Sequence, residues 1–224
     1  MSRDARDELT RRTVFAAVSR LLRYPDEELV EDLPVLRRTV ADLPRSVGDP
    51  LLGLVGHLEV TPLLELQRSY VSTFDLKRRC CLYLTYYLNG DTRRRGMALW
   101  RFAETYRRTG LRLESGELPD FLPVLLEYAV VGDGITGLGL LVEHREGLEV
   151  LRQALRSLHS PYAGALDALC RVLPEMGEEE LAAALRLAAE GPPAELVGVA
   201  PMAPFGVVDA EGADGLERVA GARA

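Results

Sequence analysis

The sequence predicts an all-α protein, a single-domain bundle of about nine or ten helices. Apolar residues recur at spacings of three and four through most of the chain, as on one face of a helix. Alternation of apolar and polar residues, which would indicate strands, holds for only a few residues at a time. Leu, Ala, Arg and Glu dominate the composition, and all four favour helices.

Proline and glycine set the expected helix boundaries in the first part of the chain. Tyr24-Pro25-Asp26 should end the first helix, because a residue before proline avoids the α region. Pro34 should kink or break the second helix, and Gly48-Asp49-Pro50 predicts a loop. Thr61-Pro62 is a typical helix start, with Thr as cap and Pro at the first helical position. The expected helices cover residues 7–23 and 26–40, a short stretch ending at 58, then 61–75 and 77–88.

The second part continues in the same way. Asn89-Gly90-Asp91 predicts a turn, with Gly90 closing one helix and Asp91 capping the next, which Gly110 should end. The stretch from 138 to 158 predicts one long helix or a broken pair, with Gly147 near the middle, and Ser160-Pro161 repeats the start seen at Thr61. The glycines at 132, 134, 137 and 139 indicate a hinge or helix break. The expected helices cover residues 91–109, 117–131, 138–158, 160–173 and 178–190.

The composition changes after Gly191. The last stretch is rich in Gly, Pro and Ala and has no helical period. Such a segment buries little apolar surface, so it is expected to be disordered or loosely attached. We therefore expect a helical domain at residues 7–190 and a tail at residues 191–224.

Charge is distributed unevenly. The chain has a net charge of −7, yet residues 68–112 hold eleven Lys or Arg against three acids, a local charge of +8. This cationic belt leaves open a nucleic-acid-binding or regulatory helical domain, although an acidic chain argues weakly against a general nucleic-acid binder.

No stretch is apolar enough for a membrane span, and the charged N-terminus is unlike a signal peptide. Three cysteines make no disulfide framework, so a cytoplasmic protein with reduced thiols is expected.

Catalytic and metal-binding patterns are absent from the sequence. His57, His144 and His159 have no partner at metal-ligand spacing, and the vicinal pair Cys80 and Cys81 is a poor zinc signal. No nucleotide-binding or serine-hydrolase motif occurs. Glu117 and Asp120 could act as an acid/base pair, but carboxylates at an expected helix start are explained by capping and the helix dipole. We therefore expect a protein that binds no metal or cofactor and is not an enzyme. An all-α enzyme whose active site has no recognised motif stays open as a further alternative.

Four linked motifs occur in order between residues 70 and 127. They are Tyr70-Val71-x-x-Phe74-Asp75, Gly90-Asp91-x-Arg93-x-Arg95-Gly96, Tyr106-x-x-x-Gly110 and Glu117-Leu118-Pro119-Asp120-x-Leu122-Pro123-x-x-Leu126-Glu127. In this order and spacing they resemble the cytoplasmic chaperones for molybdenum-cofactor assembly of respiratory nitrate reductase, called NarJ-type. These belong to the redox-enzyme maturation chaperones related to TorD, and Ser160-Pro161-Tyr162 also fits.

The resemblance implies an all-helical protein that is not an enzyme. Members of this family bind the N-terminal segment of the apo catalytic (alpha) subunit of nitrate reductase. They hold it competent for molybdenum-cofactor insertion and for attachment of its iron–sulfur and membrane partners, and then release it. The resemblance gives no role to Cys80 and Cys81 and does not reach the tail.

A docked peptide would need an apolar groove with a charged edge. The stretch 70–127 supplies aromatic anchors, although core packing is the favoured explanation of any single one of them. Glu117 and Asp120 could pair with basic client residues or with the arginine belt. The expected peptide-binding residues are Tyr70, Phe74, Asp75, Tyr86, Asp91, Arg93, Arg95, Trp100, Glu117 and Asp120.

Overall fold

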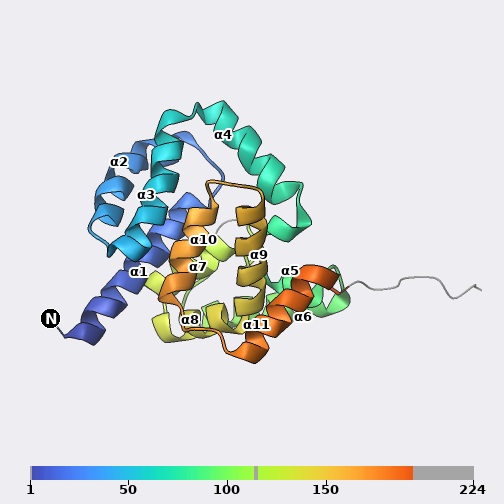
Figure 1. Cartoon of the computed structure of the whole chain (residues 1–224). Coiled ribbons are helices and arrows are strands. Elements are labelled where there is room, and N and C mark those ends of the chain that lie inside the picture. The colour runs from blue at the N-terminus through green and yellow to red at the C-terminus, as the bar shows by residue number, and fades with distance from the viewer. Residues whose placement is uncertain (1, 114–115, 194–224) are drawn as a thin grey trace, which may run out of the picture. The chain divides into compact units, whose positions relative to one another are not determined.

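The computed structural model describes residues 2–113 and 116–193 and contains eleven α-helices within them (Figure 1). It has no strand in that part of the chain, so the all-α prediction is confirmed. The helices are α1 (Arg3–Leu21), α2 (Glu27–Ala41), α3 (Arg45–Val60), α4 (Leu63–Tyr70), α5 (Leu84–Asn89), α6 (Arg93–Arg108), α7 (Leu122–Val131), α8 (Gly134–Glu143), α9 (Arg145–Ser157), α10 (Ala163–Val172) and α11 (Glu178–Glu190).

Several boundaries follow from local chemistry as predicted. The side chain of Asp26 accepts a hydrogen bond from the Leu29 N–H (2.7 Å) and so caps α2. Gly90 ends α5 at φ +56° and Gly110 follows α6 at φ +81°, conformations that glycine adopts without strain. The helix at 178–190 has its predicted limits. From residue 194 onward, the expected tail lies outside the described residues.

The expectations at two prolines had different outcomes. Pro34 lies inside α2, so the helix does not break there and the kink stays a prediction, whereas Gly48-Asp49-Pro50 was wrongly expected to be a loop and is part of α3. Tertiary packing explains the second case, because α3 is held between α2 and α10. A Cβ on Gly48 would lie 2.7 Å from the Val40 carbonyl oxygen, and one on Gly164 of α10 would lie 2.3 Å from that of Pro50. Close backbone contact on both sides therefore compensates for the poor local helix signal.

The helix expected over residues 77–88 was only partly right. The chain forms a 3₁₀ turn at Arg78–Cys80, continues in extended form, and becomes helical at Leu84. The extended part pairs with the segment before α7, since the Leu122 N–H donates to the Leu82 carbonyl (2.8 Å) and the Leu84 N–H to that of Asp120 (3.0 Å). Local apolar periodicity contains no information about this long-range pairing.

Residues 117–120 were expected to open a helix, yet α7 begins only at Leu122, with Pro123 in its first turn. Of the two readings of 138–158, the broken pair is correct. The break falls at His144 between α8 and α9, and Gly147 lies inside α9 against the ring of Tyr87. Asp91 does not cap α6; its carboxylate pairs with Arg95 instead, and Thr92 is the residue before the helix.

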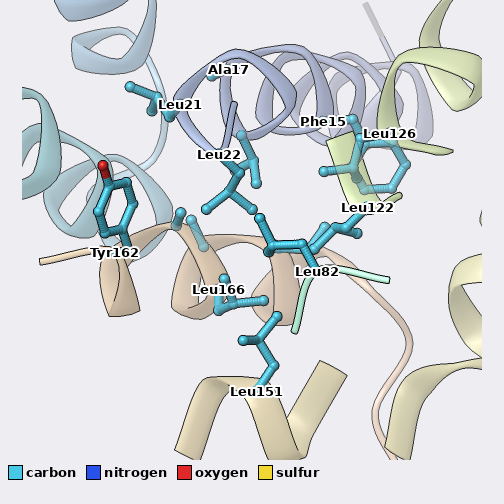
Figure 2. Close-up of a cluster of buried hydrophobic side chains, with 14 of the residues drawn as sticks. Phe15, Ala17, Leu21, Leu22, Leu82, Leu122, Leu126, Leu151, Tyr162 and Leu166 are labelled. Atoms are coloured by element: carbon cyan, nitrogen blue, oxygen red, sulfur yellow. The ribbon is translucent and has the colours of Figure 1, made fainter. Parts of the chain in front are cut away.

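The core is a continuous set of apolar side chains from the central helices. Helix α1 packs on α7 and α10, α10 packs on α3 and α9, and α11 covers α9 (Figure 1). Figure 2 shows Leu22 just after α1, Leu122 of α7 and Leu166 of α10 gathered about Leu82 of the extended segment. This segment thus enters the middle of the bundle, and its neighbour Tyr83 is held at a defined position.

The glycines of α8 provide a test of packing. A Cβ on Gly137 would lie 2.6 Å from the Cα and Cβ of Ala129 in α7, whereas one on Gly139 would have no atom within 4 Å. We expect Gly137→Ala to lower the free energy of unfolding by about 1–3 kcal/mol through overpacking. Gly139→Ala should raise it by about 0.5–1 kcal/mol, the usual gain for alanine in a helix. Urea unfolding of both variants measures this difference, and equal effects would contradict the close α7–α8 contact.

Candidate functional site

A hollow of about 370 Å³ lies where the chain after α1, the end of α4 and the start of α7 come together. We call it the aromatic hollow. Its volume falls in the range of small-ligand pockets and suits a few apolar side chains of a bound peptide. It is lined by Arg23, Tyr24, Asp26, Tyr70, Phe74, Asp75, Leu82, Tyr83, Glu117, Phe121 and Val124.

One wall is an aromatic cluster centred on Tyr70. Its hydroxyl donates to the carbonyl of Leu22 at the end of α1 (2.9 Å), and its ring lies 4.7 Å from that of Phe74 and 5.5 Å from that of Tyr24. After α4 the chain widens into a π-helical turn, Val71–Asp75, closed by the Leu76 N–H donating to the Val71 carbonyl (3.1 Å). Such turns are rare and occur frequently at functional sites. Here the turn presents both Phe74 and Asp75 to the hollow.

The opposite wall is formed by Tyr83 and Phe121, whose ring centres are 5.3 Å apart. These two residues form an isolated antiparallel bridge, so their rings project from a fixed backbone. The Tyr83 hydroxyl donates to Oε2 of Glu117 (3.0 Å). Partial burial, together with the negative charge of Glu117, raises the pKa of Tyr83 to about 12, so the phenol keeps this proton at neutral pH.

The mouth of the hollow carries more acid than base. Its charged residues are three carboxylates and one guanidinium, Arg23, which forms an ion pair with Glu127 outside the hollow. Asp26 is engaged by Arg20 and by the N-terminus of α2, whereas Asp75 and Glu117 are exposed. An aromatic floor with a negative edge favours a ligand that has apolar side chains and positive charges.

A second hollow of about 320 Å³ adjoins the first, since Arg23 and Val124 line both. Its further lining comes from Tyr106 and Tyr128, whose rings are 4.4 Å apart, and from the chain after α6. The two hollows together form a longer surface than either alone, as a peptide segment would need.

Four of the ten predicted site residues line the aromatic hollow, and the other six do not. Tyr70, Phe74, Asp75 and Glu117 line the aromatic hollow together. Arg95 lies behind its wall, 5.9 Å from the ring centres of Tyr83 and Tyr86, and pairs with Asp91 (3.3 Å). The residues that do not line the hollow are Tyr86, Asp91, Arg93, Arg95, Trp100 and Asp120, and of these Trp100 is 54% exposed on α6 while Tyr86 is buried.

Asp120 was expected at the polar edge, and this was wrong because its side chain is fully buried. Oδ2 accepts hydrogen bonds from the backbone N–H (3.1 Å) and the hydroxyl (2.6 Å) of Thr85. A helix start leaves N–H groups without partners, and α5 has no cap from its own preceding residue. Asp120 therefore caps α5 from 35 residues away and secures the wall that holds Tyr83.

The sequence analysis missed Arg23, Tyr24, Asp26, Leu82, Phe121 and Val124 as lining residues. The first three were interpreted only as the boundary between two helices, and they lie far from the 70–127 stretch in sequence. Tyr70 bonding to Leu22 brings them to the hollow, a contact with no local signal. Phe121 lies inside the recognised motif, at a position that the motif leaves unspecified.

The described residues include no metal-binding cluster and no membrane-spanning helix, and the thiols of Cys80 and Cys81 are not activated. Within residues 2–113 and 116–193, no group of three or more His, Cys, Asp or Glu side chains is placed to hold a metal ion. No helix in the same residues is long and apolar enough to cross a membrane. Burial raises the pKa of both Cys80 and Cys81, so neither thiol is activated as a nucleophile.

The fold and this site define the class: an all-helical protein with an open, aromatic, acid-edged hollow. The chain belongs to the nitrate reductase delta subunit family, whose model matches residues 40–184. It is 30% identical over 171 residues to the probable nitrate reductase molybdenum cofactor assembly chaperone NarJ of Bacillus subtilis, covering 76% of this chain and 93% of that one.

Two further proteins are similar. The chain is 39% identical over 165 residues to the nitrate reductase-like protein NarX of Mycobacterium tuberculosis H37Rv, covering 74% of this chain but only 25% of that relative's length. A solved structure described as a redox enzyme maturation protein from Archaeoglobus fulgidus matches with a TM-score of 0.52 at 23% identity. It covers 70% of this chain and 90% of that one, which supports the fold.

Proposed function

We propose that this chain is a system-specific chaperone of nitrate reductase assembly. It binds the N-terminal segment of the apo catalytic subunit and holds that subunit competent for molybdenum-cofactor insertion and complex assembly. Family membership and the names of the relatives support this proposal. The cytoplasm, expected from the sequence, is where it would act, and the proposal includes no catalytic step. No observation favours the nucleic-acid alternative.

The observation that carries the proposal is the aromatic hollow. Eight of its eleven lining residues lie within the segment that matches the family, residues 40–184. An amphipathic peptide helix can place its apolar face in such a hollow and its charges at the edge. The apolar side chains would contact Tyr70, Phe74 and Phe121, and basic residues of the client would pair with Asp75 and Glu117.

The acidic edge gives the first test of this proposal. We expect Asp75→Asn combined with Glu117→Gln to weaken binding of the client peptide about threefold to tenfold. The effect is small because exposed ion pairs contribute only about 0–1 kcal/mol each. The peptide is the N-terminal segment of the nitrate reductase catalytic subunit, measured by calorimetric titration. The difference should shrink at high ionic strength, where salt screens exposed charges.

The matched control is Glu31→Gln combined with Glu175→Gln, two exposed carboxylates outside the hollow that give the same change in net charge. This control should bind as tightly as the parent. Equal weakening in both double variants would mean that net charge alone acts, and the acidic edge would then have no specific role. If the parent chain neither binds the peptide nor co-purifies with the apo catalytic subunit, the proposed function itself is wrong.

A further inference from the structure

A third hollow, of about 500 Å³, is lined by residues of the 3₁₀ turn Arg78–Cys80 and of helices α9 and α11. We propose that it docks an acidic amphipathic helix of a partner protein, separately from the aromatic hollow. We call it the cationic hollow. It is lined by Lys77, Arg78, Arg79, Cys80, Val150, Gln153, Ala154, Ser157, Leu158 and Ala188, and it shares none of these with the aromatic hollow.

Three consecutive cations stand on one side of this hollow. Lys77, Arg78 and Arg79 are all exposed, and none has a carboxylate within 4.0 Å in the described part of the chain. The Lys77 ammonium donates to the carbonyl of Ser72 (3.0 Å). Among residues 2–113 and 116–193, no Asp or Glu lines the hollow. The acids of this described part therefore leave three positive groups here without a matching carboxylate.

The rest of the lining is apolar or already bonded. Val150 and Ala154 of α9, Leu158 just after it and Ala188 of α11 line the hollow together, and Leu158 is 43% exposed. The Gln153 amide donates one hydrogen bond to Glu149 (2.8 Å) and keeps a second N–H that can donate to a partner carboxylate. The Ser157 hydroxyl already donates its proton to the Gln153 carbonyl (2.9 Å). Leu185, 62% exposed, lies one turn before Ala188 on the same face of α11 and extends the apolar surface.

An acidic amphipathic helix matches this combination. Its apolar face would contact α9 and α11, and its carboxylates would pair with the three cations at the edge. Single-stranded nucleic acid is disfavoured because no aromatic side chain lines the hollow for bases to stack on. A lipid surface is disfavoured because the apolar residues line a concavity, whereas membrane anchors expose a protruding apolar face. The inference does not depend on the proposed nitrate reductase client.

The test uses the full chain and a synthetic helical peptide with Leu at three- and four-residue spacing and Glu on the remaining face. Fluorescence anisotropy should show that this peptide binds, while the same peptide with Lys in place of Glu does not. Arg78→Glu combined with Arg79→Glu should weaken binding at least about tenfold, because two favourable charge pairs become repulsive. Leu158→Asn should weaken it about threefold or more by removing apolar contact.

The matched control is Arg6→Glu combined with Arg38→Glu, two exposed arginines away from this hollow that give the same change in net charge. This control should bind the peptide like the parent, and circular dichroism and melting curves should show all variants folded. Binding equal to the parent in the Arg78/Arg79 variant, or no binding by the parent, overturns the proposal. Displacement of the peptide by an oligonucleotide or by anionic phospholipid vesicles, with tighter binding of either, overturns it as well.

Discussion

Replacing Asp120 by Ala should lower the free energy of unfolding by about 2–4 kcal/mol, the largest loss of stability we expect from a single polar residue here. The carboxylate is fully buried and accepts two hydrogen bonds from Thr85. Alanine would leave the Thr85 N–H and hydroxyl inside the bundle without their partner, and it would remove the cap of α5. Urea unfolding followed by circular dichroism measures this change.

Two controls separate the cap from the charge. Asp120→Asn keeps an oxygen that can accept from Thr85, so it should cost about 1 kcal/mol or less. Glu117→Ala, three residues earlier and exposed, should change stability by less than about 0.5 kcal/mol. If Asp120→Ala unfolds at the same urea concentration as the parent, the carboxylate is not the cap that its two hydrogen bonds indicate. This result also bears on function, because the same residue fixes the segment that presents Tyr83.

Replacing Tyr83 by Ala should lower the affinity for the proposed client peptide about thirtyfold, or about 2 kcal/mol, as expected for an aromatic residue central to an interface. Its ring forms one wall of the aromatic hollow against Phe121, and its hydroxyl holds Glu117 at the mouth. Alanine removes the apolar wall and releases the carboxylate at the same time. Calorimetric titration of the full chain with the N-terminal segment of the nitrate reductase catalytic subunit measures the change.

The companion variants decide where the peptide lies. Tyr83→Phe keeps the ring and loses only the hydrogen bond to Glu117, so affinity should fall about fivefold or less. Trp100→Ala should leave affinity unchanged, since this exposed residue of α6 does not line the hollow. A loss with Trp100→Ala larger than that with Tyr83→Ala would move the binding surface to α6. The aromatic hollow would then be rejected as the site while the proposed function would stand.

The polar edge consists of fewer residues than the sequence indicated. Asp75 and Glu117 stand at the mouth, whereas Asp91 and Arg95 pair with each other beside the ring of Tyr86. The buried carboxylate of Asp120 accepts a hydrogen bond from the Thr85 hydroxyl inside the bundle. Carboxylates that look equivalent in the motif therefore have different roles, and only the exposed ones remain available to a client.

Sequence periodicity by itself determined the helical class and most helix limits. The 3.6-residue repeat of apolar side chains is a local property, and so is the conformational freedom that lets Gly90 and Gly110 end helices at positive φ. The aromatic pair Tyr70 and Phe74 was likewise predicted to lie together, because both belong to a motif with fixed spacing, and both line the aromatic hollow.

The tertiary structure alone decided which of these residues meet. Three such contacts join residues 35 to 48 positions apart in sequence. They are the pairing of Leu82 with Leu122, the cap that Asp120 gives to Thr85 and the hydrogen bond from Tyr70 to Leu22. Such contacts depend on how helices pack, and packing energy comes from shape and burial summed over the whole bundle. Local propensity contains none of that information, so an extended segment was read as helix and a buried cap as a surface charge.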